Sequence, residues 1–222
     1  MKKLTILRIL LTPFLFAIIT SFLAILFNSC NTSESGFEPI FDGKTFAGWE
    51  GDTVNTWKII DGAIVGGSLE ETVPHNDFVC TEKSYVNFIL KLKFKLEGAP
   101  NMNAGVQFRS ARLEDPEHEM IGYQSDIADG IYGSLYDESR RKDFLCDNKF
   151  EDPNSIVNIN GWNDMEIRAE GLRIQIFING KQTVDYREED FHINQEGLIG
   201  LQIHGGAKAI ASYKDIRIKV LP

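Results

Sequence analysis

Paired turn residues recur along most of this chain and divide it into short segments. Seven Asp-Gly, Asn-Gly or Gly-Gly pairs separate short apolar runs between residues 42 and 206. Such punctuation is typical of antiparallel strands joined by tight turns. From residue 37 onward, no stretch of ten or more residues carries an amphipathic helical pattern. The body of the chain, residues 37–222, is therefore predicted to be a single all-β domain.

Individual strands are visible where apolar and polar residues alternate. Residues 88–96 place Phe and Leu on one side and Lys on the other, residues 173–184 form a hairpin around Asn179-Gly180, and residues 216–220 supply a closing strand. About ten short strands without intervening helices favour a two-sheet antiparallel jelly-roll sandwich, with a closed barrel as the alternative. Residues 139–160 are predicted to form a long loop.

The N-terminal segment is typical of an exported protein. Residues 1–29 hold three basic residues, no acidic residue and an apolar run over 9–27, and Ser29 precedes Cys30. This pattern resembles a bacterial lipoprotein signal peptide, which predicts a lipid on Cys30 and a short tether over 30–36. We therefore expect a lipid-anchored protein of the cell envelope, in the periplasm or on the outer membrane surface, that meets the membrane only through its lipid. An uncleaved membrane anchor is the alternative, because the apolar run is long enough to span a bilayer.

The charge and cysteine content of the chain limit the binding partners and bonds that are expected. The formal net charge is -9, and loss of residues 1–29 with their three basic residues would make it more negative, so nucleic acid is not an expected partner. Cys80 and Cys146 would remain in the mature chain. They form either a disulfide or two separate thiols, and their spacing is not that of a metal site.

Three predicted strands share an unusual polar face. Alternate residues of a strand point to the same side, so Gln107 lies with Arg109, Gln124 with Asp126, and Gln202 with His204. Each segment thus combines an amide with a titratable or cationic group. If the three strands are neighbours, these residues line one groove that could bind a ligand. The alternative is that they form a solvated face of the sheet without a function.

Further polar residues are predicted to lie at the rim of this groove. The segment 131–141 supplies aromatic, acidic and basic side chains suited to a sugar, or else a surface network of ion pairs. Residues 75–77 form a second polar cluster. The candidate rim residues are Tyr136, Glu138, Arg141, His75 and Trp49.

Several of these stretches together resemble a known family. The stretches 41–49, 103–109, 122–126, 133–141, 161–163, 197–204 and 214–218 are similar, in order, to the family of 3-keto-disaccharide hydrolase domains, common in exported proteins of Bacteroidetes. The resemblance implies a concanavalin A-like lectin or glucanase type of jelly roll and action on 3-keto sugars. Ala104 and the Gln124, Asp126 pair depart from residues common in that family.

A 3-keto glycoside can be cleaved without an oxocarbenium ion, because the ketone acidifies the hydrogen on C2. We expect Asp126 or His204 to remove that proton, Arg109 or a divalent cation to stabilise the enolate, and Glu138 or His204 to protonate the leaving group. Hydroxyl groups would be bound by Gln107, Gln124 and Gln202, and a sugar ring would stack on Tyr136 or Trp49, with His75 and Arg141 as further contacts. A divalent metal ion is possible, since Asp126, Glu138 and His204 carry oxygen and nitrogen ligands suited to such an ion, although their spacing is no known metal signature.

Three other functions are weighed against this one. A non-catalytic carbohydrate-binding module on a lipid anchor would use the same groove, but such modules rarely gather an acid, a base and a cation on one face. A structural envelope lipoprotein that binds protein would need an exposed apolar patch. An ordinary glycosidase would need two close carboxylates, and the pair Asp164 and Glu166 is interpreted as part of a structural strand.

Overall fold

The structure is a computed structural model that describes residues 35–222. The predicted signal segment, the lipidation site Cys30 and most of the predicted tether lie outside the described residues. Within the described part of the chain, no helix is long and apolar enough to cross a membrane.

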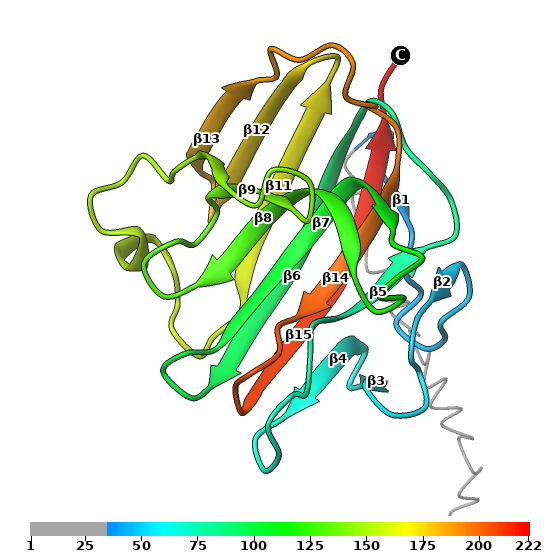
Figure 1. Ribbon diagram of the computed structural model, residues 1–222, viewed down its shortest axis with the longest axis vertical. Coiled ribbons are helices and arrows are strands. Elements are labelled where there is room, and N and C mark those ends of the chain that lie inside the picture. The colour runs from blue at the N-terminus through cyan, green and yellow to red at the C-terminus, as the bar shows by residue number, and fades with distance from the viewer. Residues whose placement is uncertain (1–34) are drawn as a thin grey trace, which may run out of the picture. The chain divides into compact units, whose positions relative to one another are not determined.

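The described chain forms two antiparallel sheets that pack face to face (Figure 1). Sheet 1 has eight strands in the order β13-β12-β11-β6-β15-β4-β3, with β1 paired to β15, and sheet 2 has seven in the order β10-β9-β8-β7-β14-β5-β2. The sandwich prediction is confirmed, and the closed barrel is wrong. The strands of sheet 1 are β1 (Glu38–Pro39), β3 (Trp57–Ile60), β4 (Ala63–Ser68), β6 (Phe88–Gly98), β11 (Asn163–Glu170), β12 (Arg173–Ile178), β13 (Lys181–Arg187) and β15 (Ala209–Val220). The strands of sheet 2 are β2 (Trp49–Glu50), β5 (Asp77–Thr81), β7 (Asn103–Arg112), β8 (Met120–Ala128), β9 (Leu135–Glu138), β10 (Phe144–Cys146) and β14 (Leu198–Ile203).

Side chains that alternate along the strands fill the space between the sheets. In β6, Phe88, Leu90, Leu92 and Phe94 are buried, while the intervening lysines are partly exposed. Sheet 2 contributes inward residues such as Val106 on β7. Each large apolar side chain buried here contributes about 1.5–3 kcal/mol of transfer free energy. The two-residue period seen in the sequence therefore reports which face of each strand meets the other sheet.

The predicted loop over 139–160 contains short elements of its own. β10 pairs with β9, and a 3-10 helix, η1 (Pro153–Ile156), is capped by the Asp152 side chain, which accepts from the Asn154 amide. Cys146 lies on β10 and Cys80 on β5, and both thiols are free. The disulfide alternative is therefore wrong.

Candidate functional site

The three strands with polar faces are neighbours at the centre of sheet 2, in the order β8-β7-β14. In the paired register, Gln107 lies opposite Gln124, and Gly105 lies opposite both Asp126 and Gln202. Directly opposed residues in antiparallel strands point to the same side of the sheet. The predicted shared face thus exists, and it is the face of sheet 2 turned away from the core.

One pocket on this face gathers several of the predicted residues. Its cavity measures about 310 Å³. We call it the carboxylate pocket, and it is lined by Asn103, Gln124, Asp126, Ile131, Tyr136, Glu138, Phe144 and His204. Five of the predicted site residues therefore come together here, and they come from strands β8 and β9 and from the end of β14.

Burial makes both carboxyl groups of the pocket hard to ionise. The Asp126 side chain is 4% exposed, and loss of solvation is the main reason that its pKa rises from 3.8 to about 7. The hydrogen bond from Gln124 lowers this pKa, and the charge of Glu138 raises it further. Burial is also the main reason that the pKa of Glu138 is raised. The charge of Glu119 raises this pKa further, and His204 lowers it. Glu138 is therefore close enough to Asp126 for its charge to raise the Asp126 pKa, and His204 is close enough to Glu138 to lower the pKa of Glu138.

A chain of amide hydrogen bonds beneath the pocket ends on Asp126. The Ser110 hydroxyl donates to Gln107 Oε1 (2.6 Å), Gln107 Nε2 donates to Gln124 Oε1 (3.0 Å), and Gln124 Nε2 donates to Asp126 Oδ1 (2.6 Å). Gln107 is fully buried and does not line the pocket. Gln107 and Gln124 thus hold and orient the carboxyl group, whereas the sequence suggested that they bind hydroxyl groups.

Unpaired polar atoms surround the same region. The Oδ1 atom of Asn103 and the Oε2 atom of Glu119 are buried and make no hydrogen bond, and the amide of the fully buried Gln202 has only Glu138 near it, whose pKa it lowers. Each buried polar atom left without a partner costs about 1–3 kcal/mol. Such atoms are uncommon in native folds, and of these residues Asn103 lines the pocket itself.

Arg109 does not join the pocket, and the prediction that it shares a face with Gln107 is wrong. The pairing of β7 with β8 shifts register between Phe108 and Ala111, and Arg109 adopts a left-handed backbone with φ 48°. This bulge interrupts the alternation of faces. The buried guanidinium donates instead to the carbonyl oxygens of Val86 (2.8 Å) and Gly171 (2.7 Å). Arg109 therefore braces loops outside the carboxylate pocket.

Two further predicted contacts lie elsewhere. Trp49 is 4% exposed in the core, where its indole nitrogen donates to the Ile40 carbonyl (2.6 Å), so it has no free ring face for a sugar. Arg141 forms ion pairs with Asp137 (3.4 Å) and Glu188 (2.9 Å), whose side chains are buried. Both residues stabilise the fold rather than line the carboxylate pocket.

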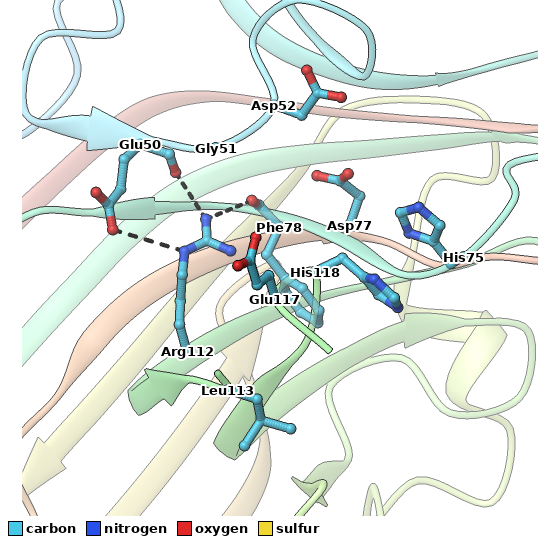
Figure 2. Close-up of a pocket in the computed structure, with 10 residues that line it drawn as sticks. All are labelled: Glu50, Gly51, Asp52, His75, Asp77, Phe78, Arg112, Leu113, Glu117 and His118. Atoms are coloured by element: carbon cyan, nitrogen blue, oxygen red, sulfur yellow. Dashed lines mark hydrogen bonds and ion pairs between the residues drawn. The ribbon is translucent and has the colours of Figure 1, made fainter. Parts of the chain in front are cut away.

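His75 belongs to a second and larger pocket on sheet 2, with a volume of about 600 Å³ (Figure 2). His75 stacks on His118, with ring centroids 4.0 Å apart. We call this cavity the histidine pocket, and its lining includes Asp52, His75, Phe78, Arg112, Glu117 and His118. Among residues 35–222, no group of three or more His, Cys, Asp or Glu side chains is placed to hold a metal ion.

The sequence interpretation missed three residues near the carboxylate pocket. Asn103 has the same parity as Gln107 on β7 and could have been found from that alternation. Phe144 lies in the segment predicted as a loop, where it packs edge-on against Tyr136. Glu119 lies just before β8 in a polar turn, and no local pattern marks its proximity to Glu138.

Comparison with known proteins supports a carbohydrate-related fold. A family model described as 3-keto-alpha-glucoside-1,2-lyase-like domain matches residues 36–219. No curated protein matches the sequence.

Solved structures show the same sandwich at low sequence identity. Two provisionally described glycosyl hydrolases from Parabacteroides distasonis superpose with TM-scores of 0.64 and 0.62, at 18% and 21% identity, covering 84% and 83% of this chain and 94% and 99% of theirs. The carbohydrate-binding module CBM66 from Bacillus subtilis gives a TM-score of 0.59 at 17% identity, covering 78% of this chain and 95% of that one. At these identities the likeness shows the fold alone.

Proposed function

Because the chain belongs to the family of 3-keto-alpha-glucoside-1,2-lyase-like domains, we propose that it cleaves 3-keto glycosides by removing the proton on C2. The observation that carries the proposal is the carboxylate pocket, where a buried aspartate with a pKa of about 7 faces a second carboxyl group and a histidine. A base works best when its pKa lies near the working pH, and burial has moved Asp126 into that range.

The chemistry requires one base and one acid. A ketone on C3 lets a base take the proton from C2, and the electrons of the broken C–H bond form an enolate. Collapse of the enolate breaks the bond between C1 and the glycosidic oxygen, which leaves with a proton from the acid. Water then adds across the resulting double bond, with its oxygen on C1 and a proton on C2, so that the overall result is hydrolysis.

The pocket residues can be assigned to these steps. Asp126 is the candidate base, since Gln124 occupies only its Oδ1 atom and leaves the other oxygen for the substrate. Glu138 is the candidate acid, because burial raises its pKa and so keeps more of it protonated. Asn103 and His204 line the same pocket and take the place beside the enolate oxygen that the sequence assigned to Arg109. Tyr136 offers its ring to the sugar.

A carbohydrate-binding module is the second candidate function, and the likeness to CBM66 favours it. A sugar-binding site gains nothing from a carboxyl group that is hard to ionise, because burial of that group costs folding stability. The raised pKa of Asp126 is therefore the feature that separates the two functions.

The test uses 3-keto-trehalose in deuterated water. We expect cleavage that places deuterium on C2 of the released sugar. Asp126→Asn should lower the rate about 10²- to 10⁴-fold, the usual contribution of a positioned base. The matched control is Asp61→Asn, which alters an exposed aspartate in the turn between β3 and β4 and should leave the rate unchanged.

Two results would overturn the proposal. Cleavage without deuterium on C2 of product or recovered substrate would exclude the elimination step. Failure to cleave any 3-keto glycoside, together with tight binding of unoxidised glucans, would establish the binding module instead.

A further inference from the structure

The centre of the outer face of sheet 1 carries more basic than acidic side chains, although the whole chain has a formal net charge of -9. Three rows of directly opposed residues cross the neighbouring strands β11, β6 and β15 on this face (Figure 1). We call their charged side chains the basic patch, which consists of Arg168 and Lys219 in the first row, Glu166, Lys91 and Arg217 in the second, and Asp164, Lys93 and Lys214 in the third. With Asp215 in the bulge between the last two rows, the patch holds six basic and three acidic residues, and all nine are at least partly exposed.

The charges of the basic patch are only partly balanced within it. Two of its lysines form ion pairs with the carboxylates of the second and third rows, at 3.3 Å and 2.6 Å. Lys214 instead lies over the Trp162 ring, with its Nζ atom 4.2 Å from the ring centroid. A neutral ring attracts a cation without cancelling its charge. The patch therefore has a net positive charge, while the rest of the chain is more acidic than the total suggests.

The described part of the chain begins on this patch. The Lys219 ammonium group donates to the Ser35 carbonyl oxygen (3.1 Å), and the centroid of the Phe37 ring lies 5.0 Å from Lys91 Nζ. Five residues separate Ser35 from Cys30, so a lipid on Cys30 would lie at most ~18 Å from Ser35. The alternative anchor, which ends at residue 27, would be eight residues away, or at most ~29 Å. Either anchor attaches the domain at the basic patch and not at the opposite face of the sandwich.

A membrane surface rich in phosphate head groups has the charge that suits this patch. Such a surface is negative and attracts basic residues that are held close to it. The attraction fades over about 8–10 Å in physiological salt, so it acts on the side of the domain that the tether keeps near the bilayer. The same surface repels the acidic remainder of the chain. Charge therefore selects one orientation of the anchored domain.

We propose that the basic patch docks on the phosphate head groups of the membrane that holds the N-terminal anchor. The protein then meets the membrane through one face of sheet 1 as well as through its lipid, whereas the sequence predicted contact through the lipid alone. In this orientation the carboxylate pocket, on the outer face of sheet 2, opens away from the bilayer. The inference takes the N-terminal segment to be an anchor and is independent of the reaction at the pocket.

The test uses the full chain, purified from cell membranes and reconstituted into vesicles of phosphatidylcholine alone or mixed with phosphatidylglycerol. A membrane-impermeant acetylating reagent and mass spectrometry measure the initial labelling rate of each lysine. Lys91 and Lys93 should react about 3- to 10-fold more slowly in the anionic vesicles than in the neutral ones. Lys142, which is exposed in the turn between β9 and β10 of sheet 2, should react equally in both. High salt should abolish the difference, because it shortens the screening length.

A charge variant and a matched control separate the patch from the overall charge. Lys214→Gln combined with Lys219→Gln removes two positive charges from the patch and should reduce the protection of Lys91 and Lys93 by more than half. Lys44→Gln combined with Lys83→Gln makes the same change of charge at exposed loop positions outside the patch and should leave the protection unchanged.

Three results would overturn the inference and leave the cleavage proposal standing. Equal labelling of the patch in both kinds of vesicle is the first, and slow labelling in both would assign the patch to a second copy of the chain instead. Protection that the Lys214, Lys219 variant retains is the second. Failure of the full chain to remain with either kind of vesicle is the third, and it would refute the anchor together with the docking.

Discussion

Replacement of Asp126 by asparagine should stabilise the folded protein at neutral and alkaline pH. The folded-state pKa of Asp126 is about 7 and the unperturbed value is 3.8. Between these values the folded protein holds a proton that the unfolded chain has released, so the free energy of unfolding falls as pH rises. Each pH unit changes it by about 1.4 kcal/mol, which gives ~4 kcal/mol over the whole interval.

Chemical denaturation of wild-type and Asp126→Asn protein at several pH values measures this effect. The asparagine oxygen can still accept from Gln124, and asparagine does not ionise. The stability advantage of the variant should therefore grow by about 3 kcal/mol between pH 4.5 and pH 8 and level off above pH 7. A difference that stays constant over this range would show that Asp126 ionises as freely in the folded as in the unfolded chain, and the argument for a tuned base would fail.

Three further variants test the roles assigned by the structure. Gln124→Met removes the donor that lowers the Asp126 pKa, so the rising limb of kcat/KM against pH should move about one unit higher, whereas Gln175→Met on the other sheet should leave the profile unchanged. Arg109→Met should lower the free energy of unfolding by about 2–4 kcal/mol without moving that profile, because the guanidinium pairs with loop carbonyls; a shifted profile with unchanged stability would contradict this. Arg141→Met should lower the free energy of unfolding by about 1–3 kcal/mol, because two buried carboxylates lose a partner. A raised KM at unchanged stability would instead show that Arg141 contacts the substrate.

The fold could be predicted from the sequence because one-sided burial leaves a two-residue period. The alternation over 88–96 and the Asn-Gly turn in 173–184 correspond to β6 and to the β12–β13 hairpin. The shortest strands, such as β2 and β10, span two or three residues and leave no period to detect. Their pairing is set by contacts with neighbouring strands, which no local pattern records.

The same two-residue alternation also predicted part of the candidate site. It brought Gln124, Asp126 and Gln202 to one face, and the structure agrees. It failed at Arg109, because one extra residue in β7 changes the parity and no local signal announces the bulge. Parity has no meaning in loops, so the positions of His75 and Arg141 could not be derived in this way.

Ser110 closes the amide chain at its far end. An ionised Asp126 can only accept, so Gln124 and then Gln107 each turn Nε2 toward the next group in the chain. The chain ends on Gln107 Oε1, to which the Ser110 hydroxyl donates. A rotated Gln124 amide would aim its oxygen at the Asp126 carboxylate and discourage ionisation of Asp126 further. Evolutionary drift at Ser110, although it is hidden below the sheet face, should therefore be limited to side chains that can donate from that position.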